Sequence, residues 1–305
     1  MSHALVIGEA LIDIARDVSG QVREFPGGSP ANVALGLARL ERSVELATWF
    51  GVDARGNVLR EHLTSDGVKL VPGSDAAART STAIATLDET GAATYTFDLL
   101  WNVPEVHLDS DVTILHAGSI AATLQPGAES VAEIALVARE HATISYDVNA
   151  RPSIMNEPAQ VLDAVERMVG RSDIVKASDE DLTWLYPAEA ALDSARRWAT
   201  QGPAVVLLTR GGDGATAVSA SGITVSMPAP DVEVADTVGA GDSYMSGFID
   251  ALWSAGLLGA ANRDQLRNID EHTLQAAMTW AGATAAITVS RPGPNPPRKN
   301  EMEPR

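Results

Sequence analysis

The sequence has no cysteine and comparatively few basic residues. Without thiols, disulfide bonds and thiolate chemistry are excluded. Lysine and arginine together number 22 against 40 aspartates and glutamates, so the formal net charge is −18. A nucleic acid or an anionic membrane would be repelled by this charge, and no run of Lys or Arg supplies a local basic patch. We therefore expect neither a nucleic acid nor a membrane as a partner.

Long hydrophobic runs are also missing. No stretch approaches the ~20 apolar residues that a membrane-spanning helix requires. The apolar start of the chain is only as long as a strand and contains Glu9 and Asp13, unlike a signal peptide. Hydrophobic residues make up 45% of the 305 residues, an ordinary globular composition. We expect a soluble, cytoplasmic protein with a single α/β domain.

Apolar runs the length of strands alternate with helical patterns along most of the chain. "ALVIG" precedes "PANVALGLARL", and "VTILHAG" precedes "GAESVAEIALVAREH". This alternation predicts a mostly parallel sheet with helices on both faces. Residues 10–26 and about 80–101 instead alternate polar and apolar residues, and the second stretch contains the turn-like "DETG" between strand-like residues. These two segments predict a small projecting sheet. The proline-rich tail, residues 295–305, is expected to be irregular.

One glycine-rich segment, "DTVGAGDSYMSG" at residues 236–247, precedes a helical pattern. It lacks the lysine of a P-loop, and the first strand lacks the glycine pattern of a dinucleotide fold. Apolar pairs recurring every four residues predict a helix that begins near Asp242 and has one buried face. The amides of Gly239, Ala240 and Gly241 would then favour an anion. A lone aspartate at such a position would ordinarily cap the helix.

Two segments carry a family resemblance. Residues 236–247 resemble the C-terminal signature of the ribokinase-like (PfkB) sugar kinase family. "GGSPANVALGLARL" at residues 27–40 resembles its N-terminal signature, with Glu41 where the family usually has Gly or Ser. The resemblance extends from "GEALIDI" to "SRPGPNPP". It implies a ribokinase-like three-layer α/β sandwich with a small β-sheet lid, and phosphoryl transfer from ATP to a sugar hydroxyl with Mg²⁺ and, as in many relatives, a monovalent cation such as K⁺.

The same resemblance assigns residue roles. Asp242 would be the catalytic base and the amides of residues 239–241 the anion hole; the alternative is a helix cap. Thr209, Gly211, Gly212 and Gly214 would bind ATP, or form a simple turn. Ser178 and Asp181 stand where the family usually has Asn-x-x-Glu near magnesium, and Asp236, with the loop around Arg291 and Gly293, would hold the monovalent cation. The sugar would be bound by Asp13, Gly27, Gly28, Asn32, Asn149 and Arg151, with Phe97 or Trp101 covering it from the lid.

The choice of substrate rests on charge and on the loop after Gly28. Phosphofructokinase-like relatives carry Lys after the paired glycines, whereas this chain has Ser29-Pro30. A neutral sugar is therefore favoured, and the segment "YTFDLLWNVPE" resembles fructokinases. A 2-keto-3-deoxygluconate kinase is the alternative; Arg151 would fit both, since a guanidinium binds hydroxyls or a carboxylate. A ribokinase or a non-catalytic sugar or nucleotide sensor is less favoured. The lid strands could also pair two subunits into a homodimer.

Overall fold

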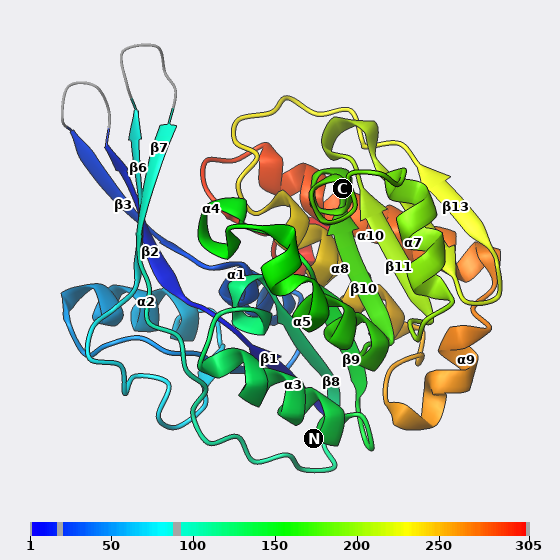
Figure 1. Cartoon of the computed structure of the whole chain (residues 1–305), viewed down its shortest axis with the longest axis horizontal. Coiled ribbons are helices and arrows are strands. Elements are labelled where there is room, and N and C mark those ends of the chain that lie inside the picture. The colour runs from blue at the N-terminus through cyan, green and yellow to red at the C-terminus, as the bar shows by residue number, and fades with distance from the viewer. Residues whose placement is uncertain (1, 17–20, 88–92, 303–305) are drawn as a thin grey trace.

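The computed structural model describes residues 2–16, 21–87 and 93–302, which form a large and a small β-sheet with helices around the large one (Figure 1). The large sheet is parallel from β5 to β11, and β12 and β13 are antiparallel at one edge. The mostly parallel sheet predicted from the sequence is confirmed. Its nine strands, in spatial order, are β13 (Thr224–Met227), β12 (Ala215–Ser219), β11 (Val205–Thr209), β10 (Ile174–Ser178), β9 (Thr143–Asp147), β8 (Val112–Gly118), β1 (His3–Ile7), β4 (Val44–Ala47) and β5 (Lys69–Leu70).

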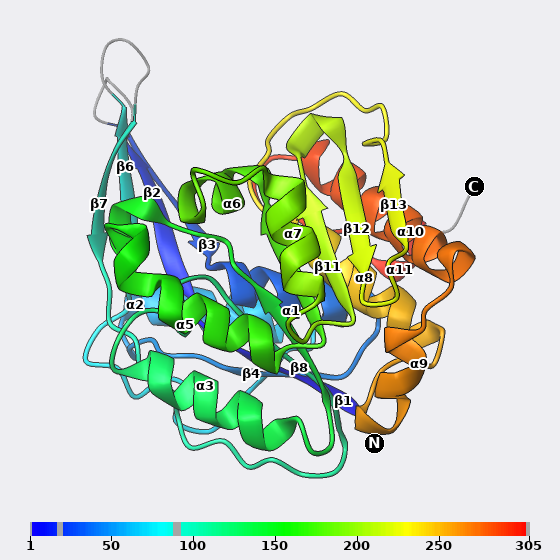
Figure 2. The same ribbon diagram turned by 45° about the vertical axis from the view of Figure 1, so that its right-hand side comes forward.

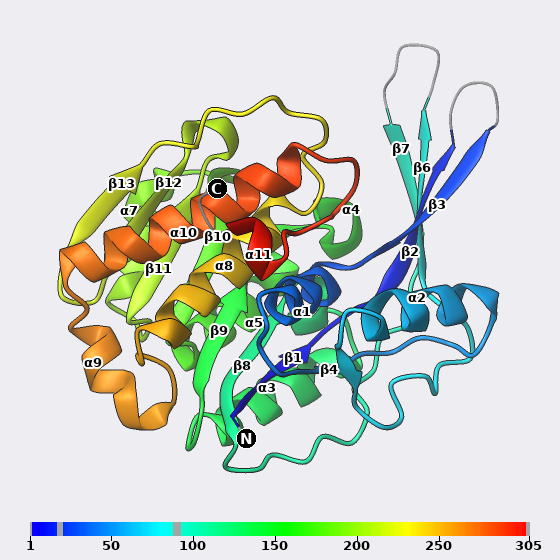
Figure 3. The ribbon, with the colours of Figure 1, turned by 180° about the vertical axis from the view of Figure 1, so that it is seen from behind.

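Helices cover both faces of the large sheet, which gives the expected three layers. Two hydrophobic cores result, one on each face of the sheet. None of the helices in the described ranges combines the length and hydropathy needed to cross a bilayer. One face carries α1 (Ser29–Arg39), α8 (Ala240–Ser254) and α10 (Glu271–Val289) (Figure 3), and the other α3 (Gly127–Ala138), α5 (Pro158–Arg171), α6 (Asp179–Leu185) and α7 (Ala191–Ala199) (Figure 2). The remaining helices are α2 (Ala54–Thr64), α4 (Pro152–Met155), α9 (Arg263–Arg267) and α11 (Lys299–Met302).

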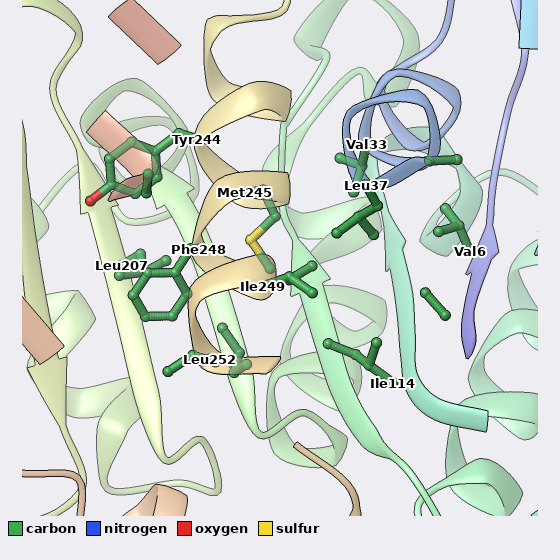
Figure 4. Packing of buried hydrophobic residues seen from close by; sticks show 14 of the residues in the cluster. Val6, Val33, Leu37, Ile114, Leu207, Tyr244, Met245, Phe248, Ile249 and Leu252 are labelled. Carbon is green, nitrogen blue, oxygen red and sulfur yellow. The ribbon is translucent and has the colours of Figure 1, made fainter. Parts of the chain in front are cut away.

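Helix α8 is buried more completely than its sequence pattern predicts. Every residue from Asp242 to Asp250 is buried, not just one face. The reason is that α8 lies between α1, α10 and the sheet; Figure 4 shows its side chains among those of α1 and the strands. Small residues permit this, since a Cβ at Gly247 would lie 2.3 Å from the Thr284 hydroxyl of α10. The side of α10 that faces α8 is therefore closely packed.

The small sheet is formed by the two segments that break the α/β rhythm. Its strands pair in the order β3-β2-β6-β7, with β2 and β6 parallel and the outer pairs antiparallel. It projects beyond the large sheet (Figure 1). The turn predicted at "DETG", residues 88–91, lies outside the described residues. The strands are β2 (Leu11–Arg16), β3 (Val22–Gly27), β6 (Thr82–Leu87) and β7 (Ala93–Asp98).

Two sequence-based expectations need correction. The C-terminal tail is not wholly irregular, because residues 299–302 form the short helix α11. Trp101 does not lie on the small sheet: β7 ends at Asp98, and the Trp101 side chain is buried in the core beneath α3. Its indole N–H donates to the Ala121 carbonyl at 3.0 Å, and a Cβ at Gly127 would collide with the ring. Trp101 therefore packs in the core beneath α3 and not on the small sheet, from which it was expected to cover the sugar.

Candidate active site

The loop before α8 places Asp242 in the first turn of the helix, as the sequence predicts. Gly239 is the N-cap residue and has φ +77°, a conformation that glycine adopts without strain. A Cβ there would also lie 2.7 Å from Pro294. Gly239, Ala240 and Gly241 thus bring their backbone amides to the start of a 15-residue helix. The Ala240 N–H donates to the Thr237 carbonyl at 3.3 Å, and the helix dipole together with the other first-turn N–H groups favours an anion here.

The Asp242 carboxylate is not used as a helix cap. Its Oδ1 accepts a hydrogen bond from the Ser29 hydroxyl at 2.7 Å, and its Oδ2 accepts one from the Asn32 side-chain amide at 2.8 Å. All three side chains are buried. Ser29 and Asn32 belong to α1, more than 200 residues away in sequence. The two segments that carry the family resemblance therefore meet at one carboxylate.

Close backbone contacts bring the start of α1 to this position. Gly28 is the N-cap residue of α1 with φ +108°, and a Cβ there would lie 2.4 Å from the Glu9 carbonyl oxygen. Pro30 lies in the first turn, where its missing N–H costs nothing. Further along, a Cβ at Gly36 would lie 2.4 Å from the Ser246 hydroxyl of α8. These glycines allow α1 to pack directly on α8 with both N-termini at the same edge.

Two more carboxyl groups lie near Asp242. Burial raises the pKa of Glu9 to about 8, and the Asp242 charge adds to this, although backbone and Ser119 hydrogen bonds and the Arg151 charge oppose it. Glu9 Oε2 is buried without a hydrogen-bond partner. Burial likewise raises the pKa of Asp13 to about 6, against the lowering effect of Arg151. The site therefore holds acids that favour nearby hydroxyl donors.

Gly27 is needed beside Asp13. The two residues lie on the neighbouring strands β2 and β3, and a Cβ at Gly27 would lie 2.0 Å from the Asp13 Oδ2. Any larger residue would push this carboxyl away. The family resemblance assigns both Asp13 and Gly27 to sugar binding from separate segments, and the structure brings these two residues close together.

Asn149 and Arg151 follow β9, at the same edge of the large sheet. Asn149 has φ +37°, and its Oδ1 accepts a hydrogen bond from Arg151 Nη1 at 2.6 Å. Arg151 is exposed, and its charge acts on both Glu9 and Asp13. The Asn149 side-chain nitrogen is buried without a partner. This arrangement places a guanidinium where its charge acts on the Glu9 and Asp13 carboxyl groups.

The glycines proposed for nucleotide binding lie in the predicted hairpin between β11 and β12. Thr209 ends β11, and Gly211 and Gly214 have φ +48° and +90°. A Cβ at Gly211 or Gly212 would meet no atom within 4 Å, so this surface is open. The hairpin is confirmed, and its role in nucleotide binding stays a prediction.

Ser178 and Asp181, expected near magnesium, form a helix cap in the structure. The Ser178 hydroxyl accepts from the Asp181 N–H at 3.0 Å, and the Asp181 carboxylate accepts from the Ser178 N–H at 2.8 Å. The other Asp181 oxygen accepts from the Ala150 N–H at 2.8 Å. Each carboxylate oxygen already has a backbone donor. The local sequence Ser-x-x-Asp therefore has a structural explanation without a metal.

Asp236 is engaged in a similar way. Its two carboxylate oxygens accept from the backbone N–H groups of Val238 at 3.0 Å and Gly293 at 2.9 Å. These bonds fasten the loop before α8 to the loop around Pro294. Across residues 2–16, 21–87 and 93–302, no three His, Asp or Glu side chains gather as a metal site would require. The residues present thus do not fit a protein-built magnesium cage, and we derive no reaction step through a metal ion.

Sequence reasoning missed a buried ion pair beneath the first turn of α8. Lys176 of β10 is in register with Asp147 of β9, and its Nζ lies 2.9 Å from Asp147 Oδ2. Burial would lower the pKa of Lys176, but Asp147, Asp181 and Asp242 more than offset this and raise it. A Cβ at Gly241 would lie 3.2 Å from Nζ. The sequence does contain a sign of this ion pair: a lysine inside the apolar strand "DIVKA" must be paired when it is buried.

Comparison with known proteins identifies the class. The profile of the pfkB family of carbohydrate kinases matches residues 1–301. The chain therefore belongs to this family, and the prediction of a carbohydrate kinase is confirmed.

Several relatives of this chain within the family are fructokinases. A fructokinase of Rhizobium leguminosarum bv. trifolii is 33% identical over 289 residues, covering 89% of this chain and 85% of that protein. A fructokinase of Klebsiella pneumoniae is 31% identical over 261 residues, covering 83% and 85%. The crystal structure of a fructokinase from Xylella fastidiosa with bound ATP superposes with a TM-score of 0.83 at 26% identity, covering 98% of this chain and 96% of that one. A fructokinase from Vibrio cholerae O395 in a form with fructose, ADP and calcium bound has a TM-score of 0.74 at 26% identity, with coverage of 96% and 94%.

Proposed function

We propose that this chain is a fructokinase that transfers the γ-phosphoryl group of ATP to a hydroxyl of fructose. The observation that carries the proposal is the position of the Asp242 carboxylate, which lies beside the helix-terminal amides and accepts hydrogen bonds from Ser29 and Asn32. The Ser29 hydroxyl and the Asn32 amide lie at hydrogen-bonding distance from the carboxylate, so a sugar hydroxyl can replace one of these donors beside Asp242. The similarity to fructokinases along most of the chain supports the choice of sugar.

The reaction joins the sugar oxygen to the γ-phosphorus and breaks the bond between that phosphorus and the bridging oxygen of ADP. Asp242 takes the hydroxyl proton, and ADP leaves with the electron pair. The amides of Gly239, Ala240 and Gly241 stabilise the negative charge on the phosphoryl oxygens, as backbone donors do in other anion holes. Base and anion hole share one helical turn, so a single element aligns both.

The sugar side is formed by Asp13, Asn32 and Arg151, with the backbone of Gly27 and Gly28 close to the ligand. The protein's net charge of −18 and the Ser29-Pro30 sequence favour a neutral sugar over a sugar phosphate. The small sheet that carries Asp13 would act as a lid, and Phe97 of β7 would contribute an aromatic surface to it. Closing such a lid limits hydrolysis of ATP by water.

The nucleotide would lie against the open surface of the β11–β12 hairpin, at Thr209, Gly211, Gly212 and Gly214. The fructokinase of Xylella fastidiosa was solved with bound ATP, which supports a donor site in this fold. Magnesium would accompany the ATP phosphates and need few protein ligands. A monovalent cation such as K⁺ would bind near Asp236 and the Gly293 loop; a potassium ion is present in one Vibrio cholerae fructokinase structure.

Two finer points belong to the same proposal. A cytoplasmic location suits a sugar kinase without cysteine. A homodimer through the small sheet is supported by its exposed edge strand β3, on which Val22 and Phe25 are 46% and 42% exposed. Unpaired edge strands are natural pairing surfaces. Light scattering of the purified protein tests this, and a monomer mass would contradict it.

A 2-keto-3-deoxygluconate kinase is the second candidate. It is favoured by Arg151, an exposed guanidinium near the sugar side that could pair with the carboxylate of this acid. Fructose offers no such carboxylate.

One assay decides between these substrates. ADP release is followed with fructose, 2-keto-3-deoxygluconate, ribose, fructose 6-phosphate and adenosine under the same conditions. The highest kcat/KM is expected with fructose. Activity confined to fructose 6-phosphate would contradict the charge argument, and no ADP release with any acceptor would favour a non-catalytic sensor.

A further inference from the structure

We propose that Lys176 is a further catalytic residue, whose ammonium group contacts the phosphoryl group in transit from beneath the anion hole. This inference rests on the proposed phosphoryl transfer. It concerns a residue that has no role in the mechanism as described above.

The position of Lys176 is the first argument. Its Nζ lies beneath the first turn of α8, 3.2 Å from the point where a Cβ of Gly241 would be. Gly241 is the last of the three small residues whose amides form the anion hole. The absent side chain at Gly241 is therefore what gives the ammonium group access to that turn. A phosphoryl group held by these amides would come within reach of the same Nζ.

The ammonium group of Lys176 has more hydrogen-bond donors than its ion pair uses. An ammonium group has three N–H donors. Within the described ranges, Lys176 forms one ion pair, with Asp147 Oδ2 at 2.9 Å. The side chain is 5% exposed, so bulk water is not a general partner for the remaining donors. Phosphoryl oxygens would accept from them.

Charge balance is the third argument. The negative charges of Asp147, Asp181 and Asp242 all act on Lys176, and the chain has a net charge of −18. The described residues provide no carboxylate cluster that would hold a metal at this place. A buried cation close to the anion hole supplies positive charge where negative charge develops in the transition state. Lys176 stays protonated throughout and transfers no proton, because that step belongs to Asp242.

A purely structural ion pair is the competing explanation, and two variants separate the two roles. Lys176→Met leaves Asp147 buried without its partner and could fail to fold. The double variant Asp147→Asn/Lys176→Met removes both charges and keeps similar volumes. If the pair is only structural, the double variant should fold and have the kcat of the wild type. If Lys176 contacts the phosphoryl group, its kcat should fall about 10²- to 10³-fold, as for loss of an oxyanion-hole donor.

The experiment measures kcat and KM with fructose and ATP, the thermal melting temperature, and the affinities for ADP alone and for ADP with aluminium fluoride in a Mg²⁺ buffer. Aluminium fluoride imitates the transferring phosphoryl group. For the double variant we expect a folded protein, a fructose KM within about 3-fold of the wild type and unchanged ADP affinity. Its affinity for ADP with aluminium fluoride should be at least 10-fold weaker. This loss of affinity is smaller than the expected loss of kcat, because aluminium fluoride imitates the transition state only in part.

Lys299→Met is the matched control. Lys299 also pairs with a buried aspartate, Asp250, at 3.4 Å, but on the opposite side of α8 among α10 and α11. Asp250 keeps Arg42 as a partner after the substitution. This variant should keep the kcat of the wild type.

The outcomes are distinguishable. Wild-type kcat in the folded double variant, or equal loss of affinity for ADP with and without aluminium fluoride, would overturn the role of Lys176 and leave the proposed kinase activity intact. A wild-type protein that phosphorylates no sugar in the panel would overturn the proposed function itself.

Discussion

Asp181 and Asp242 both lie in the first turn of a helix at the same edge of the large sheet, yet their carboxylates have different partners. Asp181 accepts from two backbone N–H groups, those of Ser178 and Ala150. Asp242 accepts from two side chains, those of Ser29 and Asn32, which belong to another helix. Backbone donors are fixed parts of the fold. Side-chain donors from a separate helix can rearrange, so a substrate can replace them.

Two aspartates at the same position of a helix can therefore have different chemical roles. A carboxylate in the first turn gains from the helix dipole in either case. At the N-terminus of α6, the Asp181 carboxylate forms a capping box with Ser178. At α8 the N-cap is Gly239, which has no side chain, and the carboxylate is directed to α1. Replacing each aspartate should therefore affect a different property.

The largest effect is expected for Asp242→Asn. An amide keeps the size of the side chain and can still accept from Ser29. Its NH2 can donate to the Asn32 side-chain oxygen once that amide turns over, but the amide cannot take a proton. We expect kcat to fall roughly 10²- to 10⁴-fold, the range of a positioned base, with little change in melting temperature. Steady-state kinetics with fructose and a thermal melt measure both quantities.

Asp181→Asn is the matched control for Asp242→Asn. It should reverse the pattern, because one cap bond is lost: the melting temperature drops and kcat changes by less than about 10-fold, far below the loss of a base. Equal losses of kcat in both variants would remove the distinction between cap and base.

Much of this site follows from the sequence, for identifiable reasons. Asp242, Asn32 and the glycines beside them belong to two segments with a strong pattern, and their helical and turn preferences are local. The contact between Ser29 and Asp242 is not local: it depends on how closely α1 packs on α8, which Gly36 and Ser246 decide. The wider burial of α8 escaped prediction for the same reason, since flanking helices are not visible in its own periodicity.

The errors are equally instructive. Trp101 was assigned to the projecting sheet because it follows strand-like residues, but the large indole is stabilised more by core burial beneath α3 than by exposure. The capping box of Ser178 and Asp181 was not predicted, although Ser-x-x-Asp before an apolar helix fits it; the role of these residues near magnesium stays a prediction. The ion pair between Lys176 and Asp147 was not predicted, because it depends on the register of β10 against β9.

Glu9 is a third case, because its Oε2 is buried and accepts from neither a backbone nor a side-chain donor. Its pKa is raised to about 8 from 4.5, so between these values the folded protein binds a proton that the unfolded chain has lost. The free energy of unfolding must therefore decrease as the pH rises through this window. Glu9→Gln removes this dependence. Relative to the wild type, the variant should gain on the order of 3 kcal/mol between pH 5.5 and pH 8.

Denaturant unfolding of both proteins at several pH values measures this difference. Glu61→Gln, at an exposed position of α2, is the control for the change in net charge. A Glu9→Gln advantage that stays the same from pH 5.5 to pH 8 would contradict a buried, protonated Glu9.

A smaller effect is expected where the N-cap of α8 is changed. Gly239→Ala forces an L-residue to φ +77° and brings a Cβ within 2.7 Å of Pro294. We expect about 2 kcal/mol less stability, and a lower kcat because the anion-hole amides shift. Gly256→Ala is the control: Gly256 has φ +72° just after the same helix, but a Cβ there meets no atom within 4 Å. It should lose stability through strain alone and keep its kcat, whereas a parallel loss of kcat would mean that strain at either end of α8 disturbs the site.

The smallest effect tests the cap at α6 directly. Ser178→Ala removes the hydroxyl that accepts from the Asp181 N–H, and Asp270→Ala removes the equivalent acceptor at the N-terminus of α10. Both should cost about 1 kcal/mol of unfolding free energy, as lost N-caps usually do. Since neither change touches Asp242 or the anion hole, the dependence of kcat on magnesium concentration should stay that of the wild type in both. A higher magnesium requirement in Ser178→Ala alone would mean that the α6 N-terminus also binds the ion, and the two first-turn aspartates would then differ less than their hydrogen bonds indicate.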